Sequence, residues 1–375
     1  MNYHKHLTLI LLVHDNIEFP KRWIEYSSFI KLPYKIFIAD GGKSSLFNDY
    51  INQNLDKLNL DIEFFKYSHE KSFSDFYKKS NDILSKVKTA YVAICSDDDF
   101  ILPLGLEKSI KFLEENKAYS SARGEMLGIF FQNYLNKDYT YGEDYEILNS
   151  AATSFSLEDR SCERRLLTHL EHYQITYYDI HRTKYLQFAY QKLLELNPTT
   201  YILAEIITSG FTVMQGKVYR NNFPFMIKDH GPSGITYNEK KVTSNLDWLT
   251  KTQWGFEYNQ IIHSFEEFLK ANEGDTINKN NNLHYAHIKF YRKALIKNLY
   301  QKENFLIKAI MYVASRLDLV FNVKSLFSKL NLITKQKFNK IEVRKNLIIK
   351  NKSYVNSNKD FNNFVNFIKK NSKNY

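Results

Sequence analysis

The first third of the chain alternates short apolar runs with longer amphipathic segments, and this alternation constrains the fold more than any other feature. Leu7–Val13 is a continuous apolar run, as expected of a strand that is buried on both faces. Further strands are predicted at 34–39, 62–67 and 89–95, and helices at 21–30, 72–87 and 103–116. The order β-α-β-β-α-β-α predicts a Rossmann-like α/β fold with a mainly parallel sheet flanked by helices.

The rest of the chain has a mixed pattern. We expect a helix at 157–173, a strand at 211–218 and, because of its Pro and Gly residues, a loop at 220–236. From about residue 246 the pattern is helical, which predicts a helical C-terminal extension.

Three polar clusters each follow a predicted strand of the first third. They are His14-Asp15-Asn16, Asp40-Gly41-Gly42 and Asp97-Asp98-Asp99. Ligands of such sheets bind beyond the carboxyl ends of the parallel strands, so the three clusters together predict one site.

The acidic triplet Asp97-Asp98-Asp99 carries the clearest chemistry. Three adjacent carboxylates repel one another, so an ordered turn that contains them favours a bound cation. Hard oxygen ligands on a short turn suit Mg²⁺ or Mn²⁺, which commonly share their coordination with substrate phosphates. The alternative is a solvated acidic turn, but the position after a buried strand favours the metal site.

This Asp-x-Asp motif, together with Asp40-Gly41-Gly42 after the second strand, resembles the nucleotide-sugar half of GT-A glycosyltransferases. The likeness is to bacterial transferases that build capsule or lipopolysaccharide glycans, and it extends over roughly residues 7–125. It implies that Asp40 bonds the nucleotide base. The residues that it places around the nucleotide pocket are His14, Asp15, Asn16 and Gly41.

The resemblance also implies roles for the acidic triplet: Asp97 faces the ribose or the metal, Asp98 lies in the cofactor-binding turn, and Asp99 is a direct metal ligand. Relatives carry an Ala-Arg-Asn triplet on the preceding helix, where this chain reads Lys79-Ser80-Asn81. Asn81 matches that triplet, whereas Lys79 departs from it and would supply the charge of the missing arginine.

The catalytic base is predicted at Glu205, the lone charge in the apolar run 202–207. An inverting transferase needs a carboxylate to take the proton of the acceptor hydroxyl, and burial raises a carboxyl pKa toward a useful value. The alternatives are a glutamate on a wet helix face or one paired with a buried arginine. Other candidate bases are Glu171, Asp179 and Asp144.

A late polar loop at 228–233 offers His230 as a further metal ligand, with Lys228 or Arg220 neutralising phosphate. The alternative for His230 is simple exposure. His169 and His172 lie three apart without a partner acid at metalloenzyme spacing, so they are interpreted as surface or acceptor-side groups.

Charge is distributed unevenly along the chain. The net charge is +11, but residues 289–375 carry +16 and residues 1–288 carry −5. This basic region favours an anionic partner, and an anionic inner-membrane surface is preferred over nucleic acid, for which no recognised module occurs. Two cysteines and the lack of an apolar stretch of ~20 residues predict a cytoplasmic protein that is peripheral at most.

The leading hypothesis is therefore a metal-dependent glycosyltransferase that moves a sugar, with a UDP-sugar as expected donor, to a surface glycan or lipid-linked acceptor with inversion. The alternatives are an inert GT-A-like nucleotide-binding scaffold and a metal-dependent phosphoryl-transfer or hydrolytic enzyme. We expect residues 1–125 to bind the nucleotide sugar, 126–240 to bind the acceptor, and 241–375 to form a helical basic region.

Overall fold

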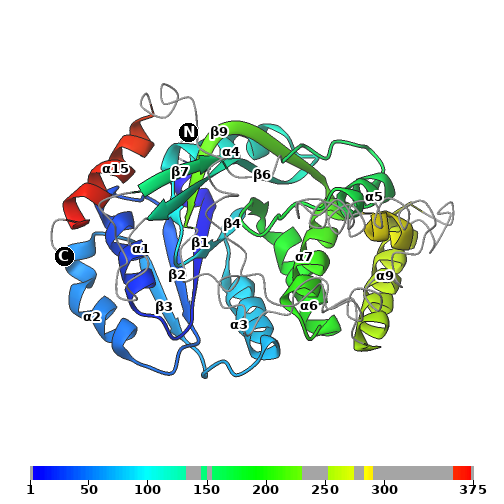
Figure 1. The fold of residues 1–375 in the computed structure, drawn as a ribbon, viewed down its shortest axis with the longest axis horizontal. Coiled ribbons are helices and arrows are strands. Elements are labelled where there is room, and N and C mark those ends of the chain that lie inside the picture. Colours follow the sequence, from blue (N-terminus) through cyan, green and yellow to red (C-terminus); the bar gives the residue numbers. More distant parts are fainter. Residues whose placement is uncertain are drawn as a thin grey trace, which may run out of the picture.

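The computed structural model describes residues 3–131, 145–149, 154–229, 252–273, 283–289 and 358–372. They form a mixed nine-stranded sheet with helices on both faces (Figure 1). The predicted α/β class, with a sheet flanked by helices, is confirmed.

The first half of the sheet is parallel, in the order β3-β2-β1-β4. These strands closely match the predicted ones, and their side chains are mostly buried, which explains their apolar runs. Their bounds are β1 Leu7–Val13, β2 Lys35–Asp40, β3 Ile62–Lys66 and β4 Tyr91–Ser96.

The second half of the sheet is mixed and continues from β4 in the order β8-β6-β9-β5. Strand β8 is antiparallel to both β4 and β6, while β6 and β9 are parallel and β9 and β5 antiparallel. The bounds are β5 Phe100–Ile101, β6 Tyr119–Phe131, β7 Tyr145–Asn149, β8 Ile180–Arg182 and β9 Lys217–Asp229.

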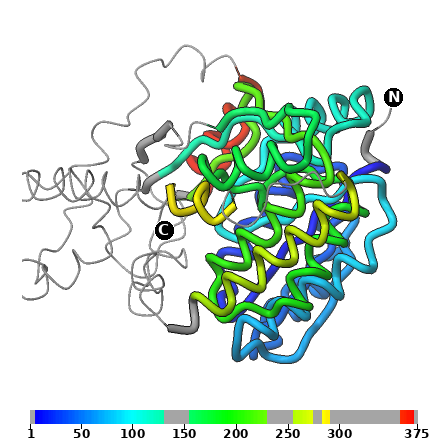
Figure 2. The backbone as a smooth tube through the Cα atoms, turned by 90° about the vertical axis from the view of Figure 1, so that its right-hand side faces the viewer, coloured from blue at the N-terminus to red at the C-terminus, as the bar shows by residue number. Residues whose placement is uncertain are grey.

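Successive residues of β1 point into two different cores. Leu9 and Leu11 pack with α1 Glu18–Phe29, α2 Leu46–Leu58 and α4 Pro103–Glu115. Ile10 and Leu12 face the opposite core. The helices of that core are α3 Phe73–Lys86, α5 Cys162–Glu171, α6 Thr183–Leu196, α7 Tyr201–Gln215 and α9 Thr252–Glu273. Figure 2 shows α7 and α9 running beside each other at the outer edge of this layer.

Three predictions of local structure were wrong. Helix α2 was not predicted, although β2 and β3 are parallel and need a crossover connection. Residues 211–215 complete helix α7 instead of opening a strand. Residues 220–229 belong to β9 instead of a loop, because register shifts in the β6–β9 pairing accommodate Pro224.

The C-terminal region contributes α9 and α15, Lys359–Ser372. Helix α15 packs Phe361, Phe364 and Phe367 against Tyr26 of α1 and Phe100 of β5. Among the described residues, no helix combines the length and the hydropathy needed to cross a bilayer.

Candidate active site

The three polar clusters lie at one edge of the sheet. Strand β1 has β2 and β4 as its two parallel neighbours, with Val13 in register with Asp40 and Leu12 in register with Ser96. The residues that follow these strands therefore meet at the same edge, as the sequence predicted.

Asp97, Asp98 and Asp99 form the turn that connects β4 to β5, called the acidic turn from here on. Side chains from distant segments hold it in place. Arg22 of α1 donates to the Asp98 carbonyl at 2.6 Å and to Asp229 Oδ2 at 3.0 Å. Asp99 is buried, and its Oδ1 accepts the backbone N–H of Asp229 at 2.9 Å. Its second oxygen, Oδ2, is also buried and has no hydrogen-bond partner among the described residues. An unpaired buried carboxylate oxygen is costly, so this atom marks a place for a cation or a water.

The electrostatics of the turn support a cation. Burial and the Asp98 carboxylate raise the pKa of Asp97 to about 7, against the opposing charges of Arg22 and Lys79. Burial raises the pKa of Asp99 well above its usual value, with Asp98 and Asp229 adding to the effect. A divalent ion would reverse both shifts, and carboxylate oxygens are the ligands that Mg²⁺ and Mn²⁺ prefer.

A small cavity of about 20 Å³ lies beneath the turn, lined in part by Asp99, Ser96 and Tyr178. Its lining is mostly apolar, and this volume is too small for a substrate.

The charge of Lys228 acts on both Glu205 of α7 and Asp99 of the acidic turn. The pKa of Glu205 is raised by burial and lowered in part by a hydrogen bond from the Tyr173 hydroxyl and by the charge of Lys228. Lys228 lies 4.3 Å from the ring centre of Tyr178 and donates to its hydroxyl.

Several carboxylates affect the pKa of the Tyr178 hydroxyl. Burial raises the pKa of its hydroxyl well above the usual value, and the charges of the acidic turn and of Glu205 add to this rise. The charge of Lys228 therefore acts on both Glu205 and Asp99, and the carboxylates of Glu205 and of the acidic turn both act on the Tyr178 hydroxyl.

Asp40, at the end of β2, is buried and uses both carboxylate oxygens. Oδ1 accepts the Gly42 N–H at 2.7 Å, and Oδ2 accepts Lys66 Nζ at 2.9 Å. A side chain at Gly42 would place its Cβ 2.7 Å from the His14 carbonyl, so the close approach of the loops after β1 and β2 requires glycine there. A Cβ at Gly41 would likewise lie 2.3 Å from Glu70 Oε1.

Lys79 on α3 is buried behind these loops. Its Nζ donates to the Val13 carbonyl at 2.8 Å and forms an ion pair of 2.5 Å with Glu70. Burial lowers its pKa, while Glu70, Asp40 and Asp97 oppose that shift. Lys79 is thus a buried cation that interacts electrostatically with carboxylates after both β2 and β4. Asn81, two residues on, is partly buried on α3.

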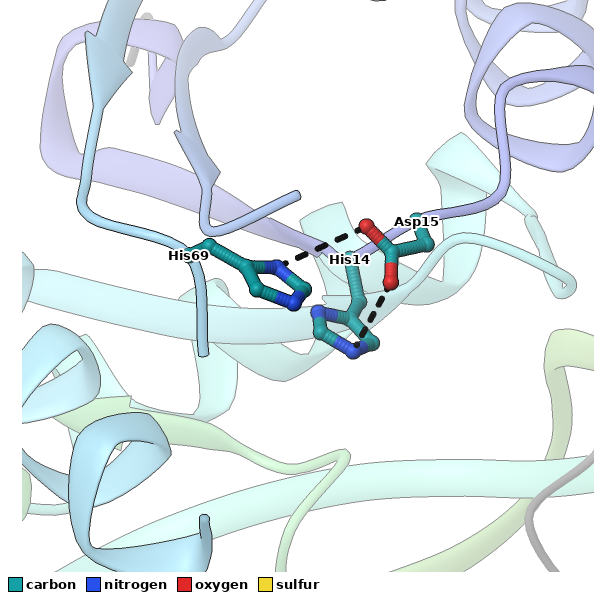
Figure 3. Close-up of side chains that lie close together, drawn as sticks. All are labelled: His14, Asp15 and His69. Atoms are coloured by element: carbon teal, nitrogen blue, oxygen red, sulfur yellow. Dashed lines mark ion pairs between the residues drawn. The ribbon is translucent and has the colours of Figure 1, made fainter. Parts of the chain in front are cut away.

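The residues of the first cluster, His14-Asp15-Asn16, follow β1 and have two different sets of partners. Asn16 Oδ1 accepts the backbone N–H groups of Glu18 and Phe19 at 2.8 and 3.3 Å, so it holds the start of α1. His14 and Asp15 turn instead toward His69, which follows β3 (Figure 3).

Of the other sequence candidates, the structure describes some and not others. His230 and Asp144 are outside the described residues. Glu171 forms ion pairs with His172 at 3.4 Å and with Lys289. Asp179, another candidate base, and Arg220, a candidate for neutralising phosphate, form a buried ion pair with each other at 2.9 Å. His169 is fully buried against Ser209 instead of lying at the surface.

Arg22, Tyr178 and Asp229 are parts of the candidate site that the sequence pattern did not predict. Arg22 occupies an otherwise ordinary amphipathic helix, and its role appears only when α1 packs beside the β4–β5 turn. Asp229 directly follows Lys228 in the polar loop segment and could have been considered from that position.

No family model matches this chain, and no curated protein matches it. Among solved structures it is similar to S. aureus TarS, at 12% identity and a TM-score of 0.42, covering 84% of this chain and 53% of that one, or about half its length. It is also similar to S. aureus TarS 1-349 in complex with UDP-GlcNAc, at 11% and 0.45, covering 83% and 92% of the two chains. The mannosyltransferase PcManGT from Pyrobaculum calidifontis, in complex with GDP-Man and Mn²⁺, matches at 10% and 0.40, covering 87% and 84%. Similarity this weak assigns no activity.

Proposed function

We propose that this chain is a glycosyltransferase of the GT-A type, which moves a sugar from a nucleoside diphosphate donor to an acceptor hydroxyl with inversion. The observation that carries the proposal is the buried acidic turn, in which Asp99 Oδ2 has no hydrogen-bond partner among the described residues. The charge of Lys228 acts on both Asp99 and Glu205, which supports Glu205 as the base that serves this turn. A cation site for the diphosphate and a carboxylate base for the acceptor are the two parts that such a transfer uses.

Asp97 and Asp99 would hold Mn²⁺ or Mg²⁺, with His230 as a further ligand. Two observations support this choice: Asp99 Oδ2 is buried without a hydrogen-bond partner among the described residues, and the pKa values of both carboxyl groups are raised. When bound, the ion would stabilise the charge that develops on the diphosphate. Arg22 holds the Asp98 carbonyl and so keeps the turn in place.

The donor nucleotide would lie along the ends of β1 and β2. Asp40 would face the base, and the residues that would line the rest of the nucleotide pocket are His14, Asp15, Asn16, Gly41 and Asp98. The glycine-dependent contact between the loops after β1 and β2 supports a common binding surface there.

Lys79 and Asn81 would serve the diphosphate end of the donor. Lys79 is within electrostatic reach of both Asp40 and Asp97, so its charge lies between the proposed base end and the proposed metal end. Its burial keeps its Nζ fixed on the Val13 carbonyl.

Glu205 would accept the proton of the acceptor hydroxyl. Its burial raises its pKa, which makes it a better base once ionised. The Tyr173 hydroxyl, 3.3 Å from Oε2, would orient the carboxylate, and Lys228 would keep it ionised near neutral pH.

The acceptor would be a surface glycan or a lipid-linked precursor, bound by residues 126–240, with residues 1–125 binding the donor. The basic region 289–375 would hold the enzyme at the anionic inner leaflet by charge. Helix α15 supports a mainly electrostatic contact, because Phe364 and Phe367 are buried in the protein while Lys369 and Lys370 are exposed. The stripe at 306–321 lies outside the described residues.

Thermal unfolding with a panel of nucleotide sugars, with and without Mn²⁺, tests the proposal. A donor that binds the native state raises the melting temperature, and we expect a UDP-sugar to do so only when Mn²⁺ is present. The donor found in this way is then incubated with lipid-linked and soluble glycan acceptors.

The products separate the three candidate activities. A new glycosidic bond supports the transferase. Release of free nucleotide or phosphate without glycoside formation would indicate a hydrolytic or phosphoryl-transfer enzyme, and binding without turnover in the presence of all acceptors would indicate a scaffold.

A further inference from the structure

A second group of metal-binding side chain types lies apart from the acidic turn. His14 and Asp15 follow β1, His69 follows β3, and β2 lies between these two strands (Figure 3). One potential ligand atom from each residue lies within 4.8 Å of the other two. His14 Nε2 is 3.5 Å from Asp15 Oδ2, and His69 Nδ1 is 3.7 Å from Asp15 Oδ1.

These separations suit one shared metal ion. Zinc lies about 2.0–2.2 Å from imidazole nitrogen and carboxylate oxygen, so two of its ligand atoms are at most roughly 4 Å apart. Both pairs that involve Asp15 satisfy this limit, each through a different carboxylate oxygen. The three ligand atoms lie within 4.8 Å of one another, so a bound ion would draw the widest pair closer together.

The surroundings of His14 provide a second observation. Its other ring nitrogen, Nδ1, faces Glu70 Oε2 at 3.8 Å, and the Glu70 side chain is only 9% exposed. Glu70 is itself held by the buried Lys79 through an ion pair. A histidine that binds a metal with one nitrogen usually directs the other toward a carboxylate or carbonyl, which fixes the ring.

The side chains of His69 and Asp15 are also positioned for metal binding. His69 Nδ1 is buried and has no hydrogen-bond partner among the described residues, although it faces Asp15. Asp15 Oδ1 accepts the Lys43 backbone N–H at 2.8 Å, which places the carboxylate between the two rings.

We propose that His14, Asp15 and His69 bind a transition metal ion of the zinc class, with Glu70 positioning His14. Two imidazoles and one carboxylate favour Zn²⁺ over Mg²⁺, whereas the all-carboxylate turn after β4 favours the hard cations. Three protein ligands leave a fourth position for water or an anionic oxygen. The ion would clamp the loop after β1 to the loop after β3. The inference goes beyond the proposed glycosyl transfer, in which His14 and Asp15 only line the nucleotide pocket, and its test does not depend on that transfer.

Isothermal titration of the metal-stripped full-length chain with ZnCl₂ tests the site. We expect one Zn²⁺ per chain, a higher melting temperature with Zn²⁺, and persistence of this binding when excess Mg²⁺ is present. His14→Ala/His69→Ala should weaken Zn²⁺ binding at least about 100-fold, and Glu70→Gln about 10- to 100-fold.

Two controls separate this site from other zinc binding. His263→Ala removes an exposed histidine of α9 and should leave the affinity unchanged. Asp97→Asn/Asp99→Asn removes the acidic turn and should also retain the Zn²⁺ event, whatever its effect on nucleotide binding. His14→Gln/His69→Gln serves as the second ligand variant if the alanine pair lowers the metal-free melting temperature.

Unchanged Zn²⁺ affinity in a folded His14/His69 variant would overturn the proposal. Loss of the event in the Asp97/Asp99 variant alone would assign the zinc to the acidic turn and would also overturn it.

Discussion

Two buried aspartates of the same sheet, Asp99 and Asp179, have opposite surroundings. Asp179, which precedes β8, accepts Ser121 Oγ at 2.7 Å and Arg123 Nε at 3.1 Å, and pairs with Arg220 Nη1 at 2.9 Å. Asp99, which precedes β5, accepts one backbone N–H and leaves an oxygen without a partner among the described residues.

This difference indicates the role of each carboxylate. A buried charge that is fully paired ties neighbouring strands together, and its removal leaves the paired cations uncompensated. A buried charge that is only partly paired raises the free energy of the unliganded protein and is better explained by a ligand. We therefore propose a structural role for Asp179 and a binding role for Asp99, although both precede a strand of the same sheet.

Asp179→Asn should have the largest effect on stability. It leaves Arg123 and Arg220 buried without their carboxylate, and burial together with Arg220 already lowers the pKa of Arg123 to about 10. We expect a loss of about 3–5 kcal/mol in the free energy of unfolding. Urea unfolding followed by circular dichroism measures it, and a loss no greater than that of Asp99→Asn would remove the distinction between the two aspartates.

The Glu205 carboxylate is intermediate between the fully paired Asp179 and the partly paired Asp99. It accepts one hydrogen bond from Tyr173, and the charge of Lys228 acts on it as it does on Asp99. Glu205→Gln tests its role. It keeps the shape and removes the basicity. Turnover should fall by roughly 10²-fold with little change in donor affinity. Steady-state kinetics at saturating donor measure this, and a variant with full turnover would place the base elsewhere.

Asp99→Asn should separate stability from binding. The amide oxygen can still accept the Asp229 N–H, and the substitution removes repulsion from Asp98 and Asp229. The metal-free variant should be as stable as the parent or more so. The parent should gain roughly 1.4 kcal/mol from Mn²⁺ and donor at about ten times their dissociation constant, and the variant should lose this gain. Equal stabilisation of both proteins would exclude Asp99 as a ligand.

The smallest expected effect concerns acid stability near Asp179. Burial, with the charge of Arg220, lowers the pKa of His169 to about 3, and Asp179 only partly opposes this. Below about pH 6.5 the unfolded chain therefore binds a proton that the folded chain does not, so stability is lost as the pH falls toward 3. The contribution of His169 to the loss between pH 6.5 and 5.5 should be about 1 kcal/mol.

His169→Gln should reduce that loss, because glutamine does not titrate and can still meet the Ser209 hydroxyl. His263→Gln, which replaces an exposed histidine of α9, is the matched control and should leave the pH dependence unchanged. An unchanged pH dependence in both variants would show that His169 does not cause the acid sensitivity.

The two halves of the sheet also differ in how far the sequence predicts them. In β1, β2 and β4 continuous apolar runs mark strands buried on both faces, and the polar residues that follow mark their ends. The helix predicted at 72–87 is α3, which begins at Phe73, and the Ser72 side chain caps it by accepting the Asp75 N–H. The common edge of the three polar clusters followed from the parallel order alone.

In the second half, local pattern was a poor guide. Strand β9 contains Pro224 and takes its place only through an irregular pairing with β6. Residues 211–215 are apolar enough for a strand, but they complete the buried helix α7, where Phe211 packs against Phe265 of α9. Periodicity cannot distinguish a buried strand from a buried helix when both faces are apolar.

The sequence by itself determined the α/β class, the strands of the parallel half and the cluster of carboxylates at their ends, because these depend on local hydrophobic pattern and strand polarity. Only the tertiary structure decided which charges are paired. Arg22, Lys228 and Tyr178 reach the acidic turn from three distant segments, and His69 reaches Asp15 across β2. Such partners depend on how elements pack, and a buried charge interacts with whatever packing places within a few ångströms, whatever its separation along the chain.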